Sequence, residues 1–162
     1  MTLVKRLKIS SVLVSVSCGL SLSLAAAAEP GRVLELTIDG VSPETGILWI
    51  SVCTEEELPR RNEGGCGAQA QIEAEDGASI TFDDLAAGEY SATAWHDVDG
   101  NGRMGFDSRG IPLEPIGNTA GATGSFGPPT FDQMKFTLPP ASSSDEPLEL
   151  VIDVDILSTA GR

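Results

Sequence analysis

Residues 32–38 read Arg-Val-Leu-Glu-Leu-Thr-Ile, with Leu34, Leu36 and Ile38 at every second position. Alternation with a period of two predicts a β-strand that buries one face. Turn residues rich in Gly and Pro separate the segments that share this pattern, and no sustained helical period occurs. The sequence therefore predicts an all-β protein, a seven-stranded antiparallel β-sandwich of the Ig-like kind. The seven expected strands are 32–38, 46–53, 68–74, 79–82, 90–95, 134–138 and 148–156.

Two further features refine this architecture. Tyr90 begins a strand directly after the Leu85–Gly88 turn, where its hydroxyl can reach back across the turn as in a tyrosine corner. The alternative is an ordinary half-buried strand tyrosine. Residues 108–130 form a long Gly/Pro-rich loop, and a loop of this length is either functional or disordered.

The amino terminus has the features of an export signal. Lys5, Arg6 and Lys8 precede an apolar, serine-containing run, and Ala25–Ala28 supply small residues for cleavage after Ala28. We expect residues 1–28 to be a Sec-type signal peptide and 29–162 to be a single β-sandwich domain. The expected location is the periplasm of a Gram-negative bacterium, or the medium. The apolar run is too short for a good membrane span.

The composition is strongly acidic. The signal segment contains three of the ten basic residues and none of the 24 acidic ones, which leaves residues 29–162 with a net charge of −17. Such a surface disfavours nucleic acid and favours cations, although acidity also serves solubility alone. We expect a monomer with an envelope or extracellular partner.

The exported segment would keep two cysteines, Cys53 and Cys66. An even cysteine count in an oxidising compartment predicts a disulfide, which would close a short loop and contribute about 3 kcal/mol. A metal-binding or redox pair is the alternative, but the spacing fits neither.

An acidic loop follows the strand that ends at Trp95. Asp97, Asp99 and Asn101 occupy the first, third and fifth positions of a calcium loop, and the Arg103 carbonyl is its seventh ligand. Asp107 is the best candidate to replace the missing glutamate at the end of the loop. We therefore predict a strand-flanked Ca²⁺ site, with a plain polar turn as the alternative.

The function predicted from these features is that of a non-enzymatic binding or structural module, with no catalytic residue assigned. One alternative is a metal-assisted hydrolase that uses His96, the only histidine, with the loop carboxylates. Another is an envelope interaction domain acting through residues 108–130. Trp49 and Trp95 are assigned to the core, with stacking on a sugar as the alternative.

Several segments together resemble the bacterial domain-of-unknown-function family 2141. The resemblance implies a small exported β-protein and no known activity. The family usually has Asp where this chain has Gly105, which leaves the loop without one expected carboxylate. The Phe-x-x-Leu-x-x-Gly-x-Tyr run also looks like prealbumin-like or carboxypeptidase-regulatory-like sandwiches. The segments that carry the family resemblance are Gly46–Cys53, Phe82–Tyr90, Trp95–Gly102, Gly110–Pro112 and Phe126–Asp132.

Overall fold

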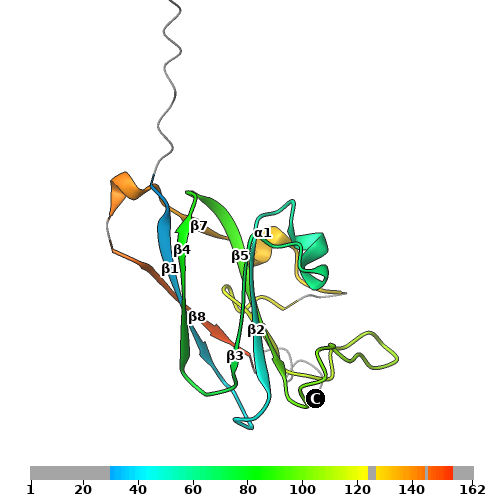
Figure 1. Ribbon diagram of the computed structural model, residues 1–162. Helices are drawn as coiled ribbons and strands as arrows, with labels where there is room; N and C mark the ends of the chain where they lie inside the picture. Colours follow the sequence, from blue (N-terminus) through cyan, green and yellow to red (C-terminus); the bar gives the residue numbers. More distant parts are fainter. Residues whose placement is uncertain (1–29, 124–126, 145, 155–162) are drawn as a thin grey trace, which may run out of the picture.

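The computed structural model describes residues 30–123, 127–144 and 146–154 (Figure 1). The signal peptide expected over residues 1–28 lies outside these ranges. The described part of the chain is all-β, as predicted, with one short α-helix and two 3₁₀ turns. The elements in chain order are β1 (Arg32–Asp39), β2 (Ile47–Cys53), η1 (Leu58–Glu63), β3 (Ala68–Glu73), β4 (Ala78–Leu85), β5 (Gly88–Asp97), β6 (Ile116–Asn118), α1 (Phe131–Met134), β7 (Phe136–Leu138), η2 (Ala141–Ser143) and β8 (Leu148–Asp153).

The strands form two sheets that face each other (Figure 1). The first sheet has the order β4-β1-β8, and the second has the order β3-β2-β5-β6. Strand β2 pairs with one edge of β5, while β6 and β7 share the other edge. Trp49 and Trp95 are direct partners in the β2–β5 register.

The core lies between the two sheets and follows the alternation read from the sequence. Leu34, Leu36 and Ile38 of β1 are fully buried and face residues of β2 and β5 in one continuous cluster. Burying each such aliphatic side chain contributes about 1.5–3 kcal/mol. The main core therefore depends on the inner faces of the two sheets, and the outer face of the larger sheet makes other contacts.

Two details differ from the predicted sandwich. The described residues contain eight strands instead of seven, because Ile116–Asn118 pairs with β5 inside the stretch expected to be a loop. The expectation of purely antiparallel sheets is wrong for one pair, since β1 and β8 run parallel from Leu34 beside Leu148 to Asp39 beside Asp153. The chain leaves the second sheet at β7 and crosses to the first sheet, so β8 enters it in the direction of β1.

A second, smaller cluster packs on the outer side of the five-stranded sheet, where Figure 1 shows η1 and α1. The predicted disulfide between Cys53 and Cys66 is present, with a Cα–Cα distance of 4.8 Å. It packs with Leu58 of η1 and with Phe131 and Met134 of α1. The cross-link therefore fixes η1 against strand β2.

The turn between β4 and β5 is closed by Tyr90. Its hydroxyl donates a hydrogen bond of 2.9 Å to the carbonyl oxygen of Ala86. This is the reach across the preceding turn that the sequence suggested, and it ties the start of β5 to the end of β4.

Candidate functional site

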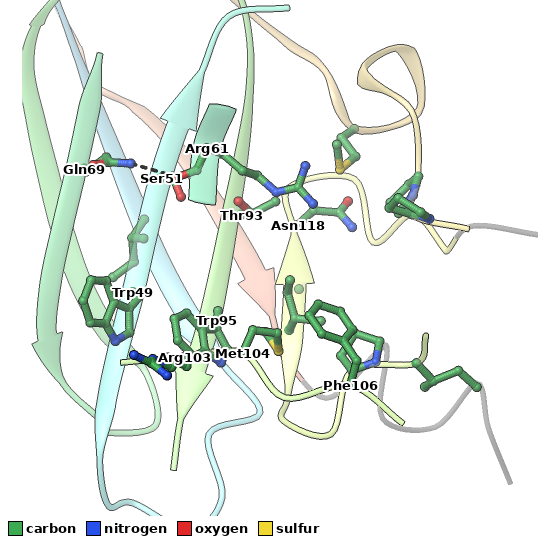
Figure 2. Close-up of a pocket in the computed structure, with 18 of the residues that line it drawn as sticks. Trp49, Ser51, Arg61, Gln69, Thr93, Trp95, Arg103, Met104, Phe106 and Asn118 are labelled. Carbon is green, nitrogen blue, oxygen red and sulfur yellow. Dashed lines mark hydrogen bonds between the residues drawn. The ribbon is translucent and has the colours of Figure 1, made fainter. Parts of the chain in front are cut away.

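A large groove lies on the outer face of the five-stranded sheet. Its volume is about 1180 Å³, and it lies between the sheet and two segments, residues 102–112 and 127–129 (Figure 2). Strand alternation creates its floor, because Trp49 and Ser51 of β2 and Thr93 and Trp95 of β5 point away from the core. Ligand pockets in proteins have similar volumes and a similar mixture of aromatic and polar lining.

The two tryptophans form the aromatic part of this floor. Their ring centroids are 5.6 Å apart and their planes differ by 23°. Both side chains are half-buried, so the expectation that they belong to the core was wrong. Leu48, Ile50 and Val52 take the inward positions of β2, and alternation sends Trp49 to the opposite face.

Each indole N–H is held by a carboxylate. Trp49 Nε1 donates to Asp97 Oδ2 at 3.3 Å, and Trp95 Nε1 donates to Glu114 Oε2 at 3.0 Å. These hydrogen bonds fix the plane of each ring relative to the sheet. The aromatic floor is thus preorganised before any ligand arrives.

The groove carries positive charge on an acidic protein. Arg61, Arg103 and Arg109 line it, and no aspartate or glutamate of the described residues does so. Arg109 is paired with Asp107 at 2.9 Å. Within the described ranges, the guanidinium groups of Arg61 and Arg103 have no ion-pair or hydrogen-bond partner. Burial lowers the pKa of the Arg61 guanidinium, because desolvation disfavours its charged form.

Polar groups surround Arg61. Figure 2 shows its side chain extending from η1 toward Thr93 and Asn118. The Asn118 amide is committed to the turn that follows β6, since its Oδ1 accepts from the N–H groups of Ala120 and Ala122 and its Nδ2 donates to the Ala122 carbonyl. The Thr93 hydroxyl has no hydrogen bond within the described part of the chain, so it remains available to a ligand.

The acidic loop predicted as a calcium site lies beside the aromatic end of the groove. Asp97 is fully buried, and its carboxylate accepts from the backbone N–H of Asn101 at 3.0 Å and of Gly102 at 2.8 Å. Asp99 Oδ1 accepts from the Asn101 N–H at 3.1 Å, and Asn101 Oδ1 accepts from the Arg103 N–H at 2.7 Å. The side chains at alternate positions therefore accept hydrogen bonds from the backbone of their own loop and stabilise its turns.

One residue outside the predicted ligand set joins this loop. Single carboxylate oxygens of Asp97, Asp99 and Glu114 all lie within 4.8 Å of one another. Glu114 Oε1 also accepts from the Val98 N–H at 3.1 Å. Three carboxylates at this spacing form an arrangement that can hold a hard cation such as Ca²⁺.

Asp107, expected to complete the calcium set, is engaged in a turn of its own. Its Oδ1 accepts from the N–H groups of Arg109 and Ile111, and its Oδ2 accepts from Arg109 Nε at 2.9 Å. The hydrogen bond from Ile111, followed by those from Arg109, lowers the pKa of the Asp107 carboxyl. Asp107 is not among the three converging carboxylates, and its role as a ligand stays a prediction.

The same turn organises a small hairpin at the edge of the groove. The Leu113 N–H donates to the Gly105 carbonyl at 2.9 Å, and Phe106 pairs with Pro112. Phe106 and Leu113 remain 56% and 68% exposed. The hairpin therefore presents an apolar lip beside the groove.

The structure does not bring His96 to the loop carboxylates. Its side chain is fully buried, and its Nε2 lies 2.7 Å from the Thr45 carbonyl oxygen. Neighbouring residues on a strand face opposite sides of the sheet, so His96 points away from Trp95 and Asp97. The geometry thus gives the hydrolase alternative no support.

Sequence reasoning missed Glu114 and Arg61, and it also assigned no site role to Ser51, Thr93 and Arg109 of the groove. Glu114 is distant in sequence from the DxDGN pattern, and a lone glutamate before Pro115 carries no periodic signal. Arg61 stands in a charged, Gly-rich segment that reads as an exposed loop. The predicted disulfide could have indicated the position of Arg61. A bridge from Cys53 to Cys66 holds the segment between them, which contains Arg61, close to the sheet.

The fold and the groove define a small two-sheet, all-β protein with an aromatic, arginine-lined outer face. The chain belongs to the family of uncharacterized proteins conserved in bacteria, DUF2141, which it matches over residues 36–145. No curated protein and no protein of solved structure matches it significantly. In the described ranges, no helix has the length and apolar character that crossing a membrane requires.

Proposed function

We propose that this protein is a non-enzymatic binding module that holds a small-molecule ligand in the groove over β2 and β5. The observation that carries the proposal is the preorganised floor of the groove, where Trp49 and Trp95 are stacked and each indole N–H is fixed by a carboxylate. The volume of about 1180 Å³ suits a ligand of drug size or larger.

A fragment screen by protein-observed NMR tests this function. We expect hits to shift the backbone amides of Ser51 and Thr93 and both indole N–H signals. Ser51→Trp should fill the groove and abolish these shifts, whereas Thr81→Trp, on an exposed position of β4, should leave them unchanged. Hits that cluster on the other sheet, or no hits at all, would contradict the proposal.

Calcium binding by the acidic loop is a second proposal. It is supported by the convergence of Asp97, Asp99 and Glu114, whose oxygens lie within 4.8 Å. Asn101 and the Arg103 carbonyl remain the further ligands expected from the loop pattern. Asp107 remains the candidate ligand at the end of the loop. An ion bound there would link Asp97 and Glu114, the two carboxylates that accept from the indole N–H groups, and so would stabilise the groove.

Thermal unfolding in calcium and in chelator tests the second proposal. We expect calcium to raise the melting temperature, and we expect Asp99→Asn and Glu114→Gln each to remove the increase. Asp107→Asn reports whether Asp107 contributes, and Glu89→Gln, on an exposed position of β5, is the matched control. An equal midpoint with and without calcium would rule the site out.

We also propose that the protein is exported and that its two sheets form an Ig-like or prealbumin-like sandwich. The charged and apolar pattern of residues 1–28 supports export. The Tyr90–Ala86 hydrogen bond supports the sandwich type. Mass spectrometry of the secreted product should give a chain beginning at Glu29, and an uncleaved cytoplasmic product would contradict export. A crystal structure with a strand connectivity foreign to both sandwich types would contradict the second part.

A further inference from the structure

We infer that the ligand of the groove is a small organic anion with a planar, apolar body, whose anionic group pairs with Arg61 while its body lies on Trp49 and Trp95. This inference rests on the proposed binding function and specifies its ligand class. The groove divides into two chemically different ends, and the charge within it is opposite to that of the protein.

The distribution of charge on the protein favours an anionic ligand in the groove. The chain has 24 acidic and 10 basic residues, yet three arginines and none of the described acidic residues line the groove. A local cationic surface on an acidic protein selects an anion that is small enough to enter it. A polyanion such as nucleic acid would also meet the repulsive field of the whole molecule, whose net charge is −14.

Arg61 is the cation best suited to receive the anionic group. It is half-buried, and its guanidinium has no partner among the described residues, whereas Arg109 is already neutralised by Asp107. A partly desolvated guanidinium gains more from an anion than an exposed one does, because the surrounding dielectric is lower. Arg103 is exposed at the other end of the groove.

The position of Arg61 is fixed by its surroundings. The Cys53–Cys66 disulfide and Leu58 anchor η1 to the sheet, and Gln69 Nε2 donates to the Arg61 carbonyl oxygen at 3.4 Å. The backbone that carries Arg61 therefore does not have to be ordered on binding, which lowers the entropic cost of recognition.

The arrangement of side chains separates a polar end from an aromatic end. In Figure 2, Ser51, Thr93 and Arg61 gather at one end of the groove, and Trp49, Trp95 and Phe106 lie at the other. The polar end supplies a guanidinium and hydroxyl groups, which together match a carboxylate, sulfonate or phosphate. The aromatic end supplies faces on which a ring system stacks. A ligand that satisfies both ends is amphipathic.

Four probes separate these contributions in calorimetric titrations of the full-length protein. Naphthalene-2-carboxylate has both the ring and the charge, naphthalene-2-methanol has the ring alone, acetate has the charge alone, and naphthalene-2-methylammonium has the opposite charge. We expect the carboxylate probe to bind about tenfold more tightly than the neutral probe. We expect the cationic probe and acetate to bind most weakly, and added salt should reduce only the advantage of the anion.

Variants at neighbouring positions identify the responsible cation. Arg61→Gln should lower the affinity for naphthalene-2-carboxylate about tenfold and leave that for naphthalene-2-methanol unchanged. Retained binding of the neutral probe shows that the variant is folded. Arg61→Lys should keep most of the affinity. Arg60→Gln makes the same change of charge one residue earlier, at an exposed position that does not line the groove, and should have no effect.

The outcomes distinguish the inference from the function on which it rests. Equal affinities for the neutral and anionic probes, with both shifting Ser51 and Thr93 amides, would overturn the anion inference and leave the groove as a binding site. Equal effects of Arg60→Gln and Arg61→Gln would also overturn the inference. Absence of any probe from the groove would overturn both proposals.

Discussion

The Oε2 atom of Glu114 accepts a 3.0 Å hydrogen bond from Nε1 of Trp95, and its other carboxylate oxygen accepts from the backbone of Val98. A single side chain thus fixes one ring of the groove and one end of the acidic loop. Asp97 does the same for Trp49 and for the backbone at Asn101 and Gly102. The acidic loop and the aromatic floor are therefore one mechanical unit.

Removing Glu114 should disturb both parts of this unit. We expect Glu114→Ala to lower the free energy of unfolding by about 1–2 kcal/mol, because two partly buried N–H groups lose a charged acceptor. Tryptophan fluorescence should also change, because the indole of Trp95 loses its hydrogen-bond partner. Denaturant unfolding measures the change in stability. Glu114→Gln keeps an acceptor oxygen and should be milder. Equal stability of Glu114→Ala and the unaltered protein would contradict this account.

Loss of the disulfide should weaken the whole protein. We expect the Cys53→Ala/Cys66→Ala double variant to lose about 3 kcal/mol of stability, because the bridge closes a loop between residues 13 apart in sequence. Reduction of the native protein should have the same effect, and chemical unfolding with and without reductant measures it. Since η1 carries Arg61, the variant should also bind naphthalene-2-carboxylate more weakly. Unchanged stability on reduction would show that the bridge is not formed in solution.

Gly46 and Gly77 offer a matched pair of substitutions. Both have positive φ, at 88° and 74°, but a Cβ at Gly46 would collide with the Asp97 carbonyl oxygen, whereas a Cβ at Gly77 meets nothing within 4 Å. We expect Gly77→Ala to cost about 1 kcal/mol for its backbone conformation alone. Gly46→Ala should cost more than about 3 kcal/mol, because β2 and β5 must also separate. Denaturant unfolding compares them, and similar costs would refute the close approach.

The turn at Asp107 should respond to acid. The hydrogen bonds from Ile111 and Arg109 lower its pKa below the ordinary 3.8, so they stabilise the folded turn at every pH above that value. This contribution is lost as the pH falls through the lowered folded pKa. An NMR titration of the Ile111 amide should therefore give a midpoint below 3.8. Asp107→Asn should abolish the titration, and a midpoint at or above 3.8 would contradict the hydrogen-bonding pattern.

The elements that depend on local periodicity were predictable. Leu34, Leu36 and Ile38 are buried as their alternation indicated, and the Cys53–Cys66 bridge was predicted from the even cysteine count and the expected export signal. Asp97, Asp99 and Asn101 accept hydrogen bonds from backbone N–H groups of their own loop, as the alternative of a polar turn implied, and their role as calcium ligands stays a prediction. In each case the prediction depends on a few neighbouring residues, or on the general rule that cysteines pair in oxidising compartments.

The features that depend on distant partners were not predictable. Ile116–Asn118 is too short for a period-two signal, so β6 became visible only through its pairing with β5. Glu114 reaches the acidic loop because of that pairing. Trp49 and Trp95 are apolar residues on strongly apolar strands, and only the position of the second sheet decides which face is covered. A groove on the outer face is a property of the assembled sheets.

The parallel pairing of β1 with β8 has a consequence for the order of events during folding. β1 is the central strand of its sheet, between β4 and β8, and the residues it contacts on β8 are more than a hundred positions away in sequence. Bringing such distant segments together costs conformational entropy, which slows folding. Topologies rich in distant contacts fold in milliseconds to seconds. Until β8 arrives, β1 exposes an unpaired edge that could pair with another chain. The partly folded chain is therefore open to association with other chains until Leu148–Asp153 has paired with β1.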